Sequence, residues 1–134
     1  MMAETIYISV EEALQMHQVL IERFGGSEGV RDLGMLQSAL LRPKSGYYST
    51  LSEQAAALLD SLANNHPFVD GNKCMAVAVT ATFLDVNGWE LHVGGAALER
   101  FIVEKVIKKR PSVSEIAAWL ERRMVQRGGG VKSS

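Results

Sequence analysis

The stretch NKCMAVAVTATFLDVN, residues 72–87, decides the fold of this chain. Its apolar residues occupy every side of a helical wheel instead of one stripe, so the sequence predicts a helix that is buried all round. Asn87 and Gly88 supply the signal that ends it. A buried helix needs other elements around it, and we therefore expect a central helix inside a small helical domain.

Further helices are predicted on both sides of this segment. Ser9 and Glu12 form a capping-box pattern before an amphipathic helix that ends at Gly25. The other predicted helices begin at Asp32, at Ser52, near Ala97, and at Ser112 or Ser114, and the last of them includes Met124. Two short β-prone segments, residues 6–8 and 89–93, could pair with each other. The prediction is an all-α fold of about six helices around a buried central helix, with at most a minor pair of short strands.

The composition fits one globular domain. Of 134 residues, 47% are hydrophobic and 22% are charged, which is close to the average for globular proteins. We expect the domain to span residues 1–127, and the glycine- and serine-rich residues 128–134 to form a flexible tail. The net charge of −1 argues against DNA binding by the chain itself. With a single cysteine and neither a signal peptide nor a membrane-spanning stretch, we expect a cytoplasmic protein with no membrane partner.

The connection before the central helix, HPFVDGNK, gathers the polar residues that can do chemistry. Pro67 ends the preceding helix and Gly71 lets the backbone turn tightly into the next one. His66 and Asp70 should therefore face one cavity. The first N–H groups of a helix have no internal partner and lie at the positive end of its dipole, so the start of the central helix is a natural phosphate site.

Each of these polar residues suits phosphate chemistry. Asp70 can hold Mg²⁺, which typically bridges one or two carboxylates to substrate phosphates. Asn72 can hydrogen-bond a phosphate or a metal-bound water, and Lys73 offers a positive charge. His66 can take a proton from an attacking hydroxyl near neutral pH. The plainer interpretations are a helix-end histidine bonded to a local carbonyl and an N-cap aspartate, and the cap is compatible with metal binding.

Other candidate residues give weaker signals. His17 and His92 have no acidic or cysteine partner at ligand spacing, so we interpret them as ordinary helix-face and strand residues. Tyr47 and Tyr48, in the loop before the central helix pair, could either lie over a target peptide or simply anchor that loop. Neither pair of residues enters the predicted site.

Residues 66–72 match the Fic signature, which is His-x-Phe-x-acid-Gly-Asn, and Lys73 matches the death-on-curing branch, where most Fic enzymes have glycine. Residues 29–40 and 83–89 also resemble death-on-curing toxins. The chain therefore resembles the Fic/Doc family in its death-on-curing (Doc) branch, over roughly residues 6–119. The resemblance implies a Fic-like helical domain.

It also implies roles for the residues of the motif. His66 would be the catalytic base and Asp70 the Mg²⁺ ligand. The cradle for the phosphates of ATP would consist of Gly71, Asn72, Lys73 and position 74, which is Cys74 here. The resemblance implies the toxin of a toxin–antitoxin module, which phosphorylates a threonine of elongation factor Tu and so arrests translation. Its partner would be an antitoxin whose helix docks in a groove beside the site.

The sequence departs from the family pattern at two positions. Cys74 stands where both branches carry a phosphate-binding arginine, and each charge-assisted hydrogen bond lost there would remove roughly 1.5–3 kcal/mol. We therefore expect attenuated activity. Val77 stands where adenylylating Fic enzymes have a second arginine, which favours the Doc branch. Two alternatives stay open: protein adenylylation, because Pro67 and Gly71 look like general Fic proteins, and a catalytically silent binding module, because of Cys74.

Overall fold

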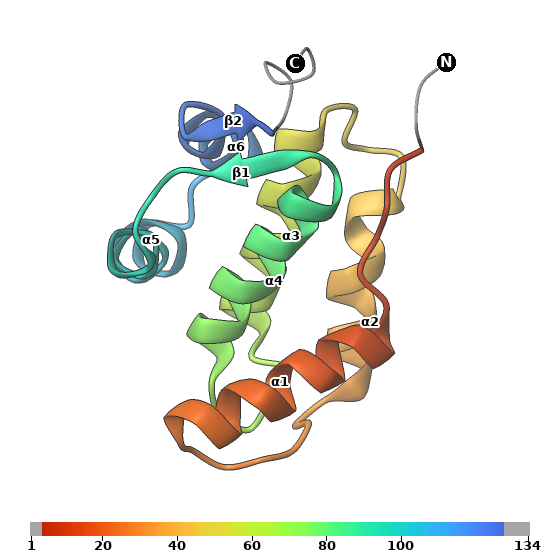
Figure 1. Ribbon diagram of the computed structural model, residues 1–134, viewed down its shortest axis with the longest axis vertical. Coiled ribbons are helices and arrows are strands. Elements are labelled where there is room, and N and C mark those ends of the chain that lie inside the picture. The colour runs from red at the N-terminus through yellow and green to blue at the C-terminus, as the bar shows by residue number, and fades with distance from the viewer. Residues whose placement is uncertain (1–3, 128–134) are drawn as a thin grey trace.

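Helices α3 and α4 lie side by side at the centre of the molecule, and the other elements pack around them (Figure 1). The structure is a computed structural model that describes residues 4–127. Its helices are α1 (Val10–Phe24), α2 (Leu33–Leu41), α3 (Leu51–Asn65), α4 (Asn72–Val86), α5 (Gly95–Phe101) and α6 (Val113–Glu121). A 3-10 turn (Arg42–Lys44) follows α2, a π-helical segment (Ile102–Ile107) follows α5, and two strands, β1 (Trp89–Leu91) and β2 (Met124–Gln126), complete the fold. The predicted mostly helical fold is confirmed.

The predicted caps begin most of these helices. Ser9 and Glu12 form both bonds of a capping box at α1, and Ser112 and Glu115 do the same at α6. The carboxylate of Asp32 accepts a backbone N–H in the first turn of α2. Side-chain oxygens thus satisfy N–H groups that a helix start leaves without a partner.

The predicted start of α3 at Ser52 is wrong by one residue. Thr50 is the cap, and its hydroxyl accepts the N–H of Glu53 at 3.1 Å. Ser52 is buried and its hydroxyl instead donates to Glu121 at 3.1 Å. This bond joins the start of α3 to the end of α6, a contact between residues far apart in sequence.

The core is formed mainly by the facing surfaces of α3 and α4. Alanines on α3 let the two helices approach closely, and large side chains fill the space on either side. The fully buried residues from these two helices and their connection include Ala55, Ala56, Leu58, Leu59, Leu62, Phe68, Met75, Val79, Phe83 and Leu84. No helix within residues 4–127 is long and apolar enough to cross a membrane.

Helix α4 is central, but the prediction that it is buried all round is wrong. One face, with Met75, Val79 and Phe83, is buried. The opposite face carries Ala78, Thr82 and Val86, and these residues line a surface groove beside α1. The difference arises because α1 crosses the lower end of α4 (Figure 1) and covers this face incompletely.

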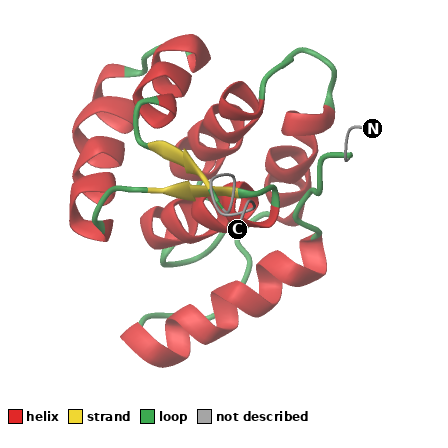
Figure 2. Cartoon of the chain, turned by 45° about the horizontal axis from the view of Figure 1, so that its top comes forward, coloured by secondary structure: helices red, strands yellow, loops and turns green. Residues whose placement is uncertain are grey.

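The two strands do not pair as predicted. β1 pairs with β2 in antiparallel register, with Trp89 opposite Gln126 and Leu91 opposite Met124. Met124 therefore belongs to a strand and not to the last helix. Residues 6–8 form no strand, and the side chain of Asn87 bonds both the N–H and the carbonyl of Ile6, each at 2.8 Å. Figures 1 and 2 place the strands at the opposite end of the α3–α4 pair from α1.

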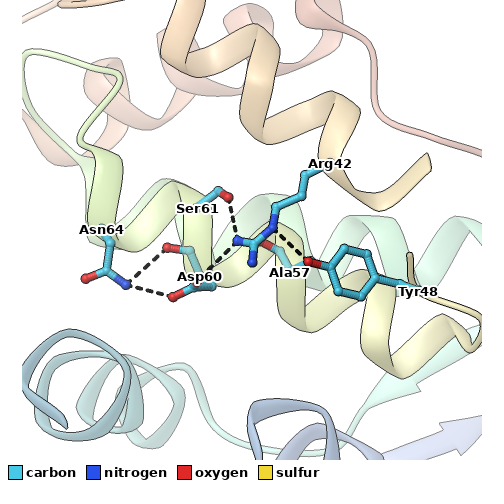
Figure 3. Close-up of polar contacts among 6 residues, drawn as sticks. All are labelled: Arg42, Tyr48, Ala57, Asp60, Ser61 and Asn64. Carbon is cyan, nitrogen blue, oxygen red and sulfur yellow. Dashed lines mark hydrogen bonds and ion pairs between the residues drawn. The ribbon is translucent and has the colours of Figure 1, made fainter. Parts of the chain in front are cut away.

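A polar network around Arg42 joins α2 to α3 (Figure 3). The guanidinium donates to Asp60 and Ser61, both at 2.9 Å, and to the hydroxyl of Tyr48 at 3.1 Å. Burial disfavours the charge, but the bonds to Asp60 and Tyr48 outweigh it and raise the pKa of Arg42 above its ordinary value. Arg42 therefore stays charged and holds the two helices together.

The same network holds one residue of the loop that contains Tyr47 and Tyr48. Tyr48 anchors the loop to Arg42 at the start of α3 (Figure 3). His66 lies at the other end of α3, about 22 Å away at 1.5 Å per helical residue. Tyr48 therefore anchors the loop, whereas Tyr47 is 86% exposed. The suggestion that these tyrosines lie over a target peptide stays a prediction. The predicted tail, residues 128–134, lies outside the described residues.

Candidate active site

The candidate active site lies where α3 ends and α4 begins. His66 ends α3 in the left-handed conformation, with φ 49° and ψ 59°. Phe68 is only 1% exposed and fixes the connection in the core. Gly71, also left-handed, precedes the first residue of α4. The site is at the end of the α3–α4 pair that lies next to α1 (Figure 1).

A cavity of about 390 Å³ opens at this point, and we call it the α4 cavity. All six residues predicted for the site line it, namely His66, Asp70, Gly71, Asn72, Lys73 and Cys74. The rest of its lining comes from the end of α1, from α5 and from the loop between α3 and α4 (residues 66–71), which we call the motif loop. These residues are Leu20, Phe24, Gly25, Val69 and Glu99. The structure thus brings the predicted residues together, while their individual roles stay predictions.

The start of α4 presents unpaired N–H groups to this cavity. Met75 is the first residue whose N–H bonds within the helix, to the carbonyl of Gly71 at 2.9 Å. The N–H groups of residues 72–74 have no acceptor within the described part of the chain. Lys73 and Cys74 are exposed beside them. This arrangement suits the oxygens of a phosphate group.

Gly71 is required at the turn into α4. Its φ is 80°, which side-chain-bearing residues rarely adopt. A Cβ atom there would lie 3.4 Å from a methyl group of Leu20 and 3.5 Å from one of Ile21. These are ordinary contact distances, so glycine is required here by its backbone conformation and not by lack of space.

The carboxylate of Asp70 is exposed and fixed by backbone donors. Oδ1 accepts the N–H of Gly71 at 3.0 Å, and Oδ2 accepts the N–H of Ser27 at 3.2 Å. Each carboxylate oxygen has a second lone pair that can bind a cation. No group of three or more His, Cys, Asp or Glu residues within residues 4–127 could hold a metal by itself. The donor set fits Mg²⁺, which combines one carboxylate with phosphate oxygens and water.

Asn72 uses its side chain inside the loop. Its Oδ1 accepts the N–H of Phe68 at 2.9 Å, and its Nδ2 donates to the carbonyl of Phe68 at 2.9 Å. These two bonds close the loop in front of α4. The phosphate contact predicted for Asn72 is therefore available to its backbone N–H and to the second hydrogen of its amide.

His17 is a residue of the site that the sequence interpretation missed. It is 5% exposed, its ring stacks on Phe68 with centroids 4.0 Å apart, and its Nε2 lies 2.9 Å from the carbonyl oxygen of Asp70. This geometry makes Nε2 the donor and Asp70 the acceptor. The helical spacing of α1 placed His17 on the inward face, and an inward imidazole needs a partner. This need for a hydrogen-bond partner was the feature of the sequence that could have identified His17 as part of the site.

The segment after α1 also supports the motif loop. Val30 pairs with Phe68 in an isolated antiparallel bridge. The N–H of Val69 donates to the carbonyl of Gly29 at 3.1 Å, and the N–H of Asp32 donates to the carbonyl of Pro67 at 3.0 Å. Main-chain bonds of this kind leave no pattern in the sequence, so this support could not be predicted from composition or spacing.

A second hollow, of about 510 Å³, runs beside the α4 cavity, and we call it the apolar groove. It is lined by one face of α1, by residues 6–8 and by the uncovered face of α4. Its main side chains are Ile6, Tyr7, Met16, Val19, Leu20, Phe24, Ala78, Thr82 and Val86, with charges at Glu12 and Arg23. Val19 is 55% exposed and Phe24 is 74% exposed. Leu20 and Phe24 line both hollows.

Comparison with known proteins agrees with this geometry. The sequence profile of the Fic/DOC family matches residues 7–84, which is more than half of the chain. Toxin Doc of Mycolicibacterium smegmatis is 44% identical over 92 residues, covering 65% of this chain and 68% of that protein. Protein kinase doc of Escherichia phage P1 is 33% identical over 86 residues, covering 61% of this chain and 68% of that protein. The family resemblance is confirmed: the chain belongs to the Fic/DOC family.

Proposed function

We propose that this chain is the toxin of a toxin–antitoxin module and transfers the γ-phosphoryl group of Mg-ATP to a protein hydroxyl. The expected target is a threonine of elongation factor Tu, so the result is arrest of translation in the cytoplasm. The observation that carries the proposal is the α4 cavity, which His66 lines together with the unpaired N–H groups that begin α4. One relative is named a toxin and another a protein kinase, which supports the proposal.

Different residues of the cavity bind the phosphates of ATP and the Mg²⁺ ion. The N–H groups of residues 72–74 and the ammonium group of Lys73 hold the phosphates of ATP. Asp70 holds Mg²⁺ together with phosphate oxygens. When bound, Mg²⁺ neutralises negative charge on the phosphates during transfer. The backbone bonds from Ser27 and Gly71 keep the Asp70 carboxylate in place for this task.

His66 acts on the target hydroxyl. Within residues 4–127, the bond from a side chain to His66 goes to its carbonyl oxygen and not to its ring, and the residue lines the α4 cavity. It accepts the proton of the hydroxyl while the hydroxyl oxygen forms a bond to the γ-phosphorus. The bond between the γ-phosphorus and the bridging oxygen breaks, and ADP leaves with that electron pair.

The apolar groove is the surface for the antitoxin. A groove lined by apolar side chains on two helices fits the apolar face of an amphipathic helix. Its charged residues, Glu12 and Arg23, lie near the two ends of α1, so the docked helix should carry a basic residue near Glu12 and an acidic one near Arg23. Because the groove adjoins the cavity at Leu20 and Phe24, a helix bound there would lie next to the nucleotide.

Cys74 supports a second candidate function, a binding module that keeps the groove without catalysis. The thiol is exposed in the cavity wall, and it cannot supply the bidentate charged contact of an arginine. Calorimetry separates the two functions. Micromolar binding of Mg-ATP supports the kinase, whereas antitoxin binding without measurable ATP binding supports the silent module.

Transfer of a labelled phosphate tests the main proposal. Elongation factor Tu is incubated with the chain, Mg²⁺ and ATP labelled at the γ-phosphate, and we expect label on a threonine. His66→Ala should lose the signal by about 10²- to 10⁴-fold. His92→Ala is the matched control, because His92 is exposed and its side chain bonds only Glu90 within residues 4–127, at 2.9 Å. Label transferred from the α-phosphate instead would show adenylylation, and no transfer from either position would refute the kinase.

A further inference from the structure

The end of α3 at His66 cannot be closed in the common way. Within the described part of the chain, His66 and Arg110 are the non-glycine residues with positive φ. A left-handed helix end is commonly closed by a bond from the N–H of the following residue. Here the following residue is Pro67, which has no N–H. The last carbonyl groups of α3 therefore need another donor.

The side chain of Arg31 supplies that donor. Its Nε donates to the carbonyl of His66 at 2.7 Å, and its Nη2 donates to the carbonyl of Asn65 at 2.8 Å. The guanidinium also places a positive charge at the negative end of the α3 dipole. The N–H of Arg31 donates to the carbonyl of Pro67 at 2.8 Å. One residue thus holds the backbone on both sides of the His66 side chain.

The ring of His66 depends on this support. No hydrogen bond holds the ring within residues 4–127, where the bond from a side chain to His66 goes to its carbonyl oxygen. The backbone therefore sets the position of Cβ and the space that the ring can reach. Proton transfer requires a donor–acceptor distance of about 2.6–3.2 Å, and a displacement of about 1 Å can lower the rate on the order of 10²-fold. A small change at the end of α3 should therefore reach the chemistry.

We propose that Arg31 is a positioning residue for His66: its guanidinium holds the left-handed backbone from which the His66 side chain reaches the α4 cavity. The catalytic part of this inference rests on the proposed kinase function, and the structural part rests on the geometry alone. Loss of the guanidinium should slow transfer and leave nucleotide binding almost unchanged. The N–H groups of residues 72–74 belong to α4, which Arg31 does not hold.

Steady-state kinetics test the catalytic part. Arg31→Met keeps the aliphatic stem and removes the donors, and we expect kcat to fall on the order of 10²-fold while KM for ATP changes less than about twofold. Arg31→Lys should recover part of the rate, because an ammonium group can still donate to one carbonyl. Arg122→Met, which removes an exposed arginine at the end of α6, should leave both constants unchanged. Unchanged kcat in Arg31→Met, or a raised KM alone, would overturn the inference.

NMR of the histidine rings tests the structural part without any substrate. The ring signals of His66, assigned with His66→Ala, should shift or broaden in Arg31→Met and stay fixed in Arg122→Met, with His92 as the internal reference. Unchanged His66 signals would overturn the positioning role even if the chain is a kinase. Shifted His66 signals without phosphoryl transfer by any variant would refute the kinase and support the role of Arg31. Thermal unfolding shows which variants are folded, and Arg31→Lys replaces Arg31→Met if the latter is not.

Discussion

The α4 cavity and the apolar groove share the helices α1 and α4, but they are constructed in opposite ways. Within residues 4–127, the cavity is defined mainly by backbone groups: N–H groups of α4 without an acceptor, a left-handed glycine, and hydrogen bonds made by the backbone of residues 27–32. The groove is defined by apolar side chains on the outside of the same helices. We therefore expect changes in the backbone path to alter the shape and activity of the cavity. We expect changes in side-chain chemistry to alter binding in the groove.

The largest expected effect is the loss of stability when a buried side chain beneath the α4 cavity is removed. Phe68→Ala removes a side chain that is 1% exposed and stacks on His17, and we expect it to lower the free energy of unfolding by about 3–5 kcal/mol. Phe24→Ala changes the same residue type in the groove, where the ring is 74% exposed, and should cost less than about 0.5 kcal/mol. Denaturant unfolding measures both. Equal losses would contradict the distinction between the two regions.

The next effect concerns the rate of phosphoryl transfer in the α4 cavity. Cys74→Arg restores a charged bidentate donor at the wall of the cavity, and we expect phosphoryl transfer to rise roughly ten- to hundredfold, corresponding to about 1.5–3 kcal/mol. Cys74→Ser, which changes the sulfur to oxygen without adding charge, should give no such gain. Initial rates with γ-labelled ATP provide the measurement. A gain in both variants would mean that the thiol itself inhibits the site.

A smaller effect should be confined to the groove. Val19→Asp places a charge where an apolar helix is expected to dock, and should weaken antitoxin binding by about tenfold or more. Transfer activity and stability should change little, since Val19 is 55% exposed and does not line the cavity. Leu33→Asp, at a residue 48% exposed on α2, is the control. Binding is measured by calorimetry with a synthetic amphipathic helix of the kind proposed for the antitoxin, and equal weakening by both variants would argue against the groove.

The smallest expected effect is a change in stability at a residue that lines neither the α4 cavity nor the apolar groove. Thr80 is fully buried on the core face of α4, and its hydroxyl has no hydrogen-bond partner within residues 4–127. Thr80→Val keeps the shape and removes the unpaired hydroxyl, so the free energy of unfolding should rise by about 1 kcal/mol. Thermal unfolding checks this. A decrease in stability would indicate that the hydroxyl has a partner.

The sequence allowed prediction of features that depend on neighbouring residues. The cavity lining from His66 to Cys74 could be predicted because a proline, a glycine and a helix start follow one another within one short segment. The capping boxes are local in the same sense. The overall helical architecture followed from the spacing of apolar residues.

Features that depend on distant residues could not be predicted in this way. The bond from His17 to Asp70 and the bonds from Arg31 to the end of α3 join separate segments. The pairing of β1 with residues 124–126 also depends on how the intervening helices bring these two segments together. The groove required knowing how much of α4 is covered by α1, because the apolar pattern of α4 alone indicated complete burial.

Leu20 and Phe24 belong to the walls of both hollows, and this sharing has a thermodynamic consequence. A ligand that moves either side chain when it binds in the groove changes the free energy of binding in the cavity. Linkage makes this effect reciprocal. If a bound helix lowers the affinity for nucleotide by some factor, bound nucleotide lowers the affinity for the helix by the same factor. The cellular level of ATP would then help to set how tightly the toxin is held in its neutralised state.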